Sequence, residues 1–176
     1  AEKESVQLLF FTDKNYPSRL KQLNDAPSLL YVKGNIDFEN SKTVAIVGTR
    51  RSTDYGKHCV EELVAGLKGH GALIISGLAY GIDIQAHKQA VKNNPCTVGV
   101  LGSGIDVIYP ATHRDIVEKM LDTGGIVSEN TFGTKPDAHN FPARNRIIAG
   151  LADALVVVEA AESGGALITA DIANSY

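Results

Sequence analysis

Five short apolar runs, each followed by a turn and then by a stretch with helical periodicity, constrain the fold more than any other feature of this sequence. The first run is Thr43–Val47, which ends at Gly48. A run without polar alternation is typical of a strand that is buried on both faces of a parallel sheet. The other runs cover residues 72–76, 97–101, 125–128 and 154–158. The alternation predicts an α/β chain with a doubly wound parallel sheet, an extended Rossmann-like fold.

The 176 residues suffice for one such domain with a full core. We expect residues 1–40 to form an N-terminal appendage, a short helix and a short strand, that packs on the core. Residues 41–176 are expected to form the Rossmann-like domain. Because the final helical pattern has no capping residue, we expect this domain to be truncated at its C-terminus. The predicted helices cover residues 16–23, 55–68, 82–93, 113–122, 140–151 and a final stretch after residue 165.

Composition and charge narrow the function classes. The net charge is −3, yet residues 48–58 and 130–150 are locally basic, so nucleic acid is not excluded. Cys59 and Cys96 have no metal-ligand spacing, and we expect no metal site. No segment has the pattern of a signal peptide or a membrane span, and the cytoplasm is the expected location.

Ligands of such sheets bind at the carboxyl ends of the strands. The residues that follow the predicted strands are glycines, hydroxyls and cations, which favour phosphate binding because glycine allows close backbone approach. These segments are Gly48–Arg51, Ser76–Ala79, Gly102–Asp106, Ser128–Lys135 and Glu159–Gly165. The sequence therefore predicts a phosphate-binding rim.

Two enzyme hypotheses fit this rim poorly. A dinucleotide site needs a second glycine where Arg50 stands, and an acidic residue where Ser76 ends the second strand. Asp83 and His87 lie at i and i+4, a spacing that suits a stabilising pair better than a catalytic one. A rim with many anion contacts and little acid–base chemistry favours a binding protein over an enzyme.

The stretch Asn140–Leu151 begins with polar residues and then becomes apolar. Pro142 suits the first helical turn, where its missing N–H has no cost. Arg144 and Arg146 lie near the helix N-terminus, where the helix dipole does not favour cations. Two readings stay open: the arginines bind an external anion such as phosphate, or they form salt bridges with nearby carboxylates.

Taken together, these motifs resemble the DNA-processing protein A (DprA/Smf) family. The resemblance covers nearly the whole chain from Tyr16 onward, and the block that begins at Asn140 is its most specific part. The motifs are Val47–Arg50, Ser76–Asp83, His87, Gly102–Asp106 with Tyr109-Pro110, Asn140–Leu151, Val158–Ala160 and Ser163–Ala170.

The resemblance implies a bacterial, cofactor-free protein that binds single-stranded DNA without sequence preference and protects incoming DNA. It also implies help in loading the RecA recombinase during natural transformation and recombination, and a homodimer in the full-length protein. By position, Arg50 is the strongest candidate for a phosphate contact. The other candidates are Arg51, Lys135, Arg144 and Arg146. Gly48, Ser103 and Gly104 would add backbone or hydroxyl contacts. Asn140, Phe141 and Asn145 would lie near bases, with Phe141 either stacking on a base or packing in the core.

The sequence departs from the family pattern at Ala166, where a serine is frequent, and at His113, where an asparagine is common. The alternative function is that of the lysine-decarboxylase-like phosphoribohydrolases, which release a base from a nucleoside monophosphate. Gly164 and Gly165 match their glycine pair and Asp171 their acidic position, but the internal Gly-Thr of their motif is missing.

Overall fold

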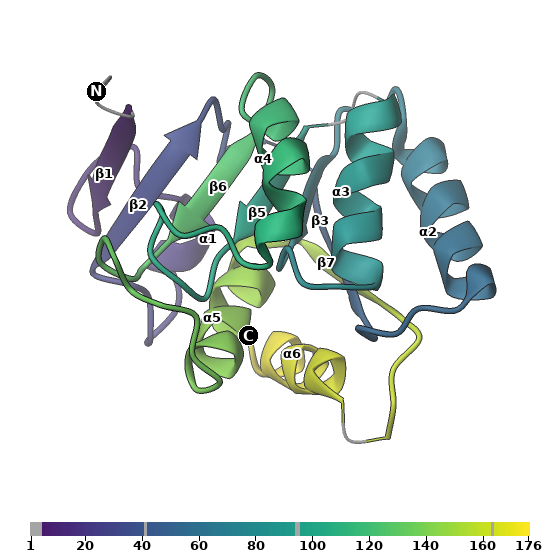
Figure 1. Cartoon of the computed structure of the whole chain (residues 1–176). Helices are drawn as coiled ribbons and strands as arrows, with labels where there is room; N and C mark the ends of the chain where they lie inside the picture. Colours follow the sequence, from purple (N-terminus) through teal and green to yellow (C-terminus); the bar gives the residue numbers. More distant parts are fainter. Residues whose placement is uncertain (1–4, 41, 94–95, 163) are drawn as a thin grey trace.

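The five apolar runs form five adjacent parallel strands of a seven-stranded sheet, as the alternation predicted. In this computed structural model, which describes residues 5–40, 42–93, 96–162 and 164–176, the strand order is β1-β2-β6-β5-β4-β3-β7 (Figure 1). The strands are β1 (Val6–Phe10), β2 (Leu29–Gly34), β3 (Thr43–Gly48), β4 (Leu73–Ser76), β5 (Thr97–Val100), β6 (Gly125–Ser128) and β7 (Ala154–Val158).

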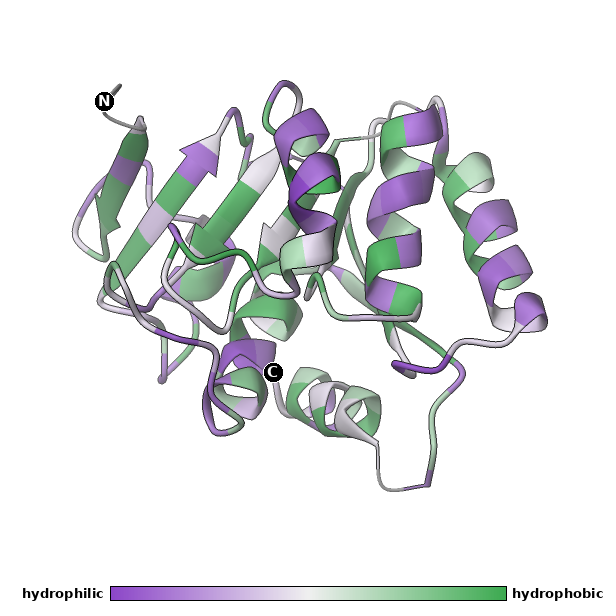
Figure 2. Cartoon of the chain, in the orientation of Figure 1, coloured by the Kyte–Doolittle hydropathy of each residue, from purple (hydrophilic) through white to green (hydrophobic). Residues whose placement is uncertain are grey.

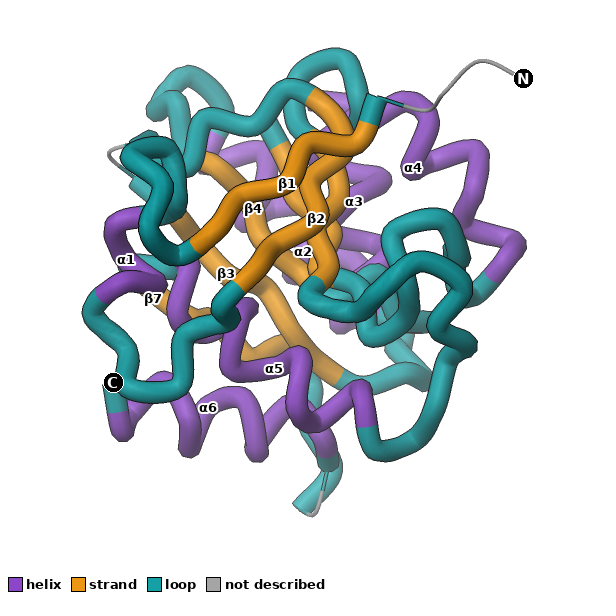
Figure 3. Tube along the Cα trace, turned by 90° about the vertical axis from the view of Figure 1, so that its left-hand side faces the viewer, coloured by secondary structure: helices purple, strands orange, loops and turns teal. Residues whose placement is uncertain are grey.

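Helices cover both faces of the sheet. Each helical layer packs on the sheet through its own cluster of buried apolar side chains. Val60 and Ala86 pack with Ile74 on one face, whereas Ile147 and Leu20 pack with Ile75 on the other. Figure 3 shows α5 and α6 running side by side beneath the strands. The helices are α1 (Ser18–Lys21), α2 (Asp54–Leu67), α3 (Ile82–Asn93), the 3-10 turn η1 (Ala111–His113), α4 (Arg114–Met120), α5 (Asn140–Leu151) and α6 (Gly165–Ser175).

The segment predicted as an appendage contributes two strands to the same sheet. β2 lies antiparallel to β6, with Val32 opposite Val127, and β1 lies antiparallel to β2. β1 was not predicted from the sequence, because most of its residues are exposed and only Leu9 is buried. Figure 2 shows the apolar character of β1 and of the inner strands, in green, against the polar outer faces of α2 and α3. The helix predicted over residues 16–23 is reduced to Ser18–Lys21.

The direction of winding reverses beside β3. The chain runs from β3 through β4 and β5 to β6, and then returns through α5 to β7 on the other side of β3. Such a reversal opens a crevice at the carboxyl ends of the two strands concerned. The fold therefore places the loop after β3 and the start of α6 around one crevice. Among the described residues, no helix is long and apolar enough to cross a membrane.

Candidate functional site

A pocket of about 410 Å³ occupies the crevice at the carboxyl ends of β3 and β7. We call it the rim pocket and define it by six of the residues that line it: Arg50, Ala79, Tyr109, Phe141, Arg144 and Gly165. These residues come from the loops after β3, β4 and β5 and from the N-terminal turns of α5 and α6. The structure thus brings most of the predicted rim segments together at one place.

Two adjacent aromatic rings and one arginine form a wall of the rim pocket. The Arg50 guanidinium lies 5.6 Å from the centroid of the Phe141 ring, within the range of a cation–π contact. The centroid of the Tyr109 ring lies 5.9 Å from that of Phe141, and the two planes are inclined by 34°. Phe141 also packs on Gly102, where an added Cβ would lie 2.8 Å from the ring. Phe141 is therefore held by packing while its ring lines the pocket.

Arg144 is buried beneath this wall and already has partners. Its Nη1 donates a hydrogen bond of 2.5 Å to the Gly77 carbonyl and another to the Val100 carbonyl. Its Nε donates to Oδ1 of Asn145 over 3.2 Å. Burial lowers the pKa of the guanidinium to about 10, against the influence of Asp83, so Arg144 stays charged at neutral pH. Through these hydrogen bonds Arg144 connects the carboxyl ends of β4 and β5. This differs from the expectation that its guanidinium is available for an external anion.

Asp83 is the carboxylate of the same buried cluster. It lies in the first turn of α3 with 6% exposure, close to the backbone amides of Gly48, Gly77 and Ala79. Burial raises the pKa of this carboxyl, and the Arg144 charge and the three amides oppose that rise. A Cβ at position 77 would lie 2.6 Å from Oδ2 of Asp83 and 2.8 Å from Nη2 of Arg144. Asp83 and Arg144 therefore pack around Gly77, in the loop after β4 that carries the pocket residue Ala79.

Arg146 has acidic partners, which agrees with the alternative reading of this helix. Its Nη2 pairs with Oε2 of Glu129, and its Nε lies 4.0 Å from Oδ2 of Asp25. Arg146 does not line the rim pocket. Its interactions instead join α5 to the start of the loop after β6 and to the N-terminal segment.

Three predicted cations are exposed and have no acidic partner in the described part of the chain. The Arg50 guanidinium lies over the Phe141 ring, and Arg51 follows it in the loop after β3. Lys135 is exposed in the loop before α5, next to Pro136, which lines the rim pocket. Arg50 therefore lines a pocket with an aromatic wall, and the other two unpaired cations directly neighbour pocket-lining residues in the sequence.

The remaining predicted site residues serve the backbone around the pocket. The Ser103 hydroxyl donates to the Val107 carbonyl over 2.6 Å, and the Gly104 amide donates to the Thr134 carbonyl over 2.9 Å. Gly48 packs against Val158, whose carbonyl oxygen would lie 1.9 Å from an added Cβ.

Two amides flank the start of α5. Asn145 accepts a hydrogen bond from Arg144 and donates over 3.4 Å to the Gly165 carbonyl, which connects α5 with α6. Asn140 is half-buried at the first residue of α5. Ser163, part of one quoted motif, lies outside the described residues. Ala166 is buried in the core beside α5.

The dinucleotide hypothesis meets a physical obstacle at α2. In a Rossmann site the N-terminus of the helix after the first strand receives the pyrophosphate. Here the Glu159 carboxylate accepts hydrogen bonds from the Thr53 amide, over 2.9 Å, and from the Thr53 hydroxyl. A Cβ at Gly56 would lie 2.2 Å from the same carboxylate. The helix N-terminus is therefore occupied by an internal anion, which would repel a pyrophosphate.

The phosphoribohydrolase hypothesis also lacks its acidic residue at the pocket. Asp171 is exposed on α6 and does not line the rim pocket. The Thr169 hydroxyl, which does line it, donates to the Gly165 carbonyl over 3.1 Å. Within residues 5–40, 42–93, 96–162 and 164–176, no group of three or more histidine, cysteine or acidic side chains is arranged to hold a metal ion.

Two aromatic residues of the site were quoted within motifs but not predicted as site residues. Tyr109 is 48% exposed and Tyr80 is 50% exposed, both in loops at the carboxyl ends of strands. The Tyr80 ring meets the His113 ring edge-on at 5.1 Å, and Nδ1 of His113 donates to the Leu78 carbonyl. Both could have been identified from the sequence, because each is an aromatic residue among glycines and polar residues in the segment that follows a strand.

His87 lies fully buried beneath the site and predicts acid sensitivity. Because the Thr97 hydroxyl donates to the Ile74 carbonyl, it accepts from Nδ1 of His87 over 2.7 Å, and Nε2 carries no proton. Nε2 has no hydrogen-bond partner in the described part of the chain. Burial, helped by the charges of His113 and Arg144, lowers the pKa of His87 from 6.5 to about 3.

A depressed pKa in the folded state contributes stability that is present above the unfolded pKa and is lost as the pH falls. We expect the free energy of unfolding to decrease by about 1.4 kcal/mol per pH unit below 6.5, or about 2 kcal/mol by pH 5. Urea unfolding at pH 6.5 and at pH 5 measures this loss of stability. His87→Gln should lose clearly less over this interval, and equal losses in both proteins would contradict the assignment.

Comparison with known proteins identifies the family of this chain. The model of the DNA recombination-mediator protein A family matches residues 7–176. Protein Smf of Synechocystis is 42% identical over 99% of this chain, which covers 45% of that protein. The crystal structure of DNA processing protein A from Streptococcus pneumoniae superposes with a TM-score of 0.92 at 38% identity, covering 98% of this chain and 60% of that one.

A structure described as the single-stranded DNA binding mode of DNA processing protein A from Helicobacter pylori is also similar. Its TM-score is 0.89 at 31% identity, over 99% of this chain and 78% of the other. The chain studied here spans about half the length of the curated relatives that it matches.

Proposed function

The chain belongs to the DNA recombination-mediator protein A family, and we propose that it binds single-stranded DNA at the rim pocket without sequence preference. One observation carries this proposal: the unpaired cation Arg50 lies over the Phe141 ring beside Tyr109, and the unpaired cations Arg51 and Lys135 follow in the adjoining loops. A cationic groove with exposed rings is how proteins bind single strands, since every base has a face that can stack. The relative from Helicobacter pylori, whose structure concerns single-stranded DNA binding, supports the same ligand.

The cations and the aromatic rings of the site have different roles in DNA binding. Arg50, Arg51 and Lys135 neutralise phosphates, and Phe141 with Tyr109 stacks a base. The side chains beneath them are already bonded to the backbone, as Arg144 is to Gly77, so they hold the loops in place and do not read base edges. This division explains binding without sequence preference, because sequence is read by contacts to base edges.

The rest of the proposal concerns the full-length protein. We propose that it acts as a binding protein and not as an enzyme, protects incoming single strands, and helps to load the RecA recombinase during transformation and recombination. A homodimer in the cytoplasm is part of the same proposal. The support is family membership and similarity to proteins named for DNA processing.

Salt dependence tests the phosphate contacts. Three phosphate contacts to a single strand predict that the logarithm of the association constant falls with the logarithm of salt concentration at a slope of about −2. Arg50→Ala should weaken binding of labelled oligothymidine and reduce that slope by about 0.7. Fluorescence anisotropy at several salt concentrations measures both quantities.

The control is Lys68→Ala. Lys68 is an exposed cation at the C-terminal end of α2, away from the residues that line the rim pocket. This variant should retain the slope of the unmodified chain. If Arg50→Ala retains it too, Arg50 makes no phosphate contact and the proposed site is wrong.

A further inference from the structure

A second aromatic surface lies at the far end of the loop that leaves the rim pocket. Residues 129–139 connect β6 with α5, and Pro136 and Ala138 of this loop line the pocket. At its other end Phe132 is 53% exposed, and its ring meets the ring of Tyr31 on β2 edge-on, with centroids 5.4 Å apart. One loop therefore joins the Tyr109–Phe141 wall to the Phe132 ring.

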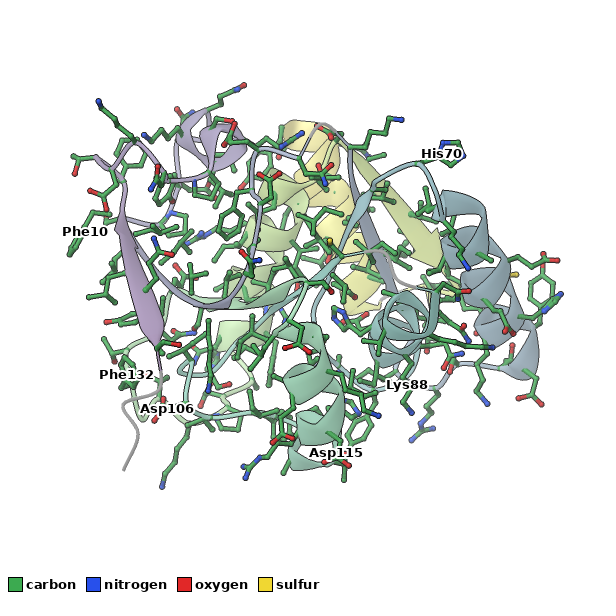
Figure 4. All side chains as sticks on the ribbon, turned by 90° about the horizontal axis from the view of Figure 1, so that it is seen from above. Phe10, His70, Lys88, Asp106, Asp115 and Phe132 are labelled. Carbon is green, nitrogen blue, oxygen red and sulfur yellow. The ribbon has the colours of Figure 1, made fainter. Side chains whose placement is uncertain are left out.

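The loop is fixed, so the Phe132 ring has a defined position. The Gly133 amide donates to both carboxylate oxygens of Asp106, over 2.9 and 3.1 Å, and Gly133 adopts a φ of +75° that favours glycine. The Thr134 carbonyl accepts from the Gly104 amide over 2.9 Å. Figure 4 shows Phe132 and Asp106 near each other at the β1 end of the molecule, whereas Phe10 lies apart from them.

Charge along the loop suits a DNA strand. Lys135 is exposed, has no ion pair in the described ranges, and stands between Phe132 and the residues at the pocket. The Asp106 carboxylate next to Phe132 disfavours a phosphate there, so the ring suits an uncharged base. The order along the chain is a stacking surface, a cation and a second stacking surface, which is the arrangement of single-strand grooves.

We infer that a DNA strand bound at the rim pocket continues past Lys135 and stacks a further base on Phe132. This inference rests on the proposed function and extends it, because it defines a second base site and hence the length of strand that one chain occupies. Tyr31 supports the ring from below and is a positioning residue.

Oligothymidines at the two ends of the range of known single-strand site sizes, about 4 and about 16 nucleotides, test the inference. Phe132→Ala should weaken binding of the longer strand by about 5- to 140-fold, the loss expected for one stacked base, and leave the shorter strand unaffected. The salt slope should not change, since no phosphate contact is lost. Phe132→Leu keeps an apolar contact with Tyr31 and should show the same loss, whereas Phe132→Tyr should retain binding.

Phe10→Ala is the matched control, because Phe10 is 50% exposed on β1 and lies away from the loop. It should bind both strands as the unmodified chain does. Equal binding of the longer strand by Phe132→Ala and by the unmodified chain would overturn the second base site. So would an equal loss with both strands. In either case, weaker DNA binding by Arg50→Ala would still support the rim pocket as the DNA site. If the unmodified chain binds neither strand, the proposed function is wrong as well.

Discussion

Asp83→Ala is expected to lower the free energy of unfolding by about 3–5 kcal/mol, the cost of leaving a buried charge uncompensated. The substitution leaves the buried Arg144 guanidinium without the nearby negative charge of Asp83, and the Gly48, Gly77 and Ala79 amides lose the carboxylate whose charged form they favour. Urea unfolding followed by circular dichroism measures the loss.

Asp54→Ala provides the comparison. Asp54 also lies in the first turn of a helix, α2, but it is exposed and pairs only with Lys57. Its removal should change stability little, because exposed ion pairs contribute little. If the two variants unfold at the same urea concentration, Asp83 is not the centre of the cluster that holds the loops.

Gly48→Ala is expected to cost about 3 kcal/mol, at the upper end of the range for overpacking. The added methyl group would lie 1.9 Å from the Val158 carbonyl oxygen and 2.6 Å from Cγ1 of Ile82. Because one of these contacts is backbone, relief requires β3 and β7 to separate where they pair, Gly48 opposite Val158. Thermal and urea unfolding both report the change.

Gly66→Ala is the matched control for this substitution. Gly66 lies inside α2, and no atom would come within 4 Å of an added methyl group. Alanine is there expected to stabilise the helix by about 0.5–1 kcal/mol. A Gly48→Ala protein as stable as the unmodified chain would contradict the close approach of β3 to β7.

The central sheet was predictable because apolar runs report burial directly. The run Thr43–Val47 and the helix Asn140–Leu151 occur as predicted, and family membership is confirmed. β1 was missed because an edge strand buries too few residues to leave a pattern. The rule that ligands bind at the carboxyl ends of strands located the pocket, but it does not state which cations remain unpaired.

The partners of the arginines depend on contacts between distant parts of the sequence. Arg144 bonds to carbonyls 67 and 44 residues away, and Arg146 pairs with Glu129. Local sequence shows a cation at a helix N-terminus in both cases, but it does not show which backbone groups meet it after folding. For the same reason Tyr109, whose ring lies beside that of Phe141, was not predicted as a site residue.

The most direct test of the central claim is the binding of a labelled oligothymidine by this chain, followed by fluorescence anisotropy at low and at moderate salt. A duplex of equal length serves as competitor. We predict binding that weakens with salt and that the duplex displaces poorly, since paired bases do not offer their faces to Phe141 and Tyr109. Equal displacement by duplex and single strand, or binding that salt does not affect, would contradict the assignment of the rim pocket to single-stranded DNA.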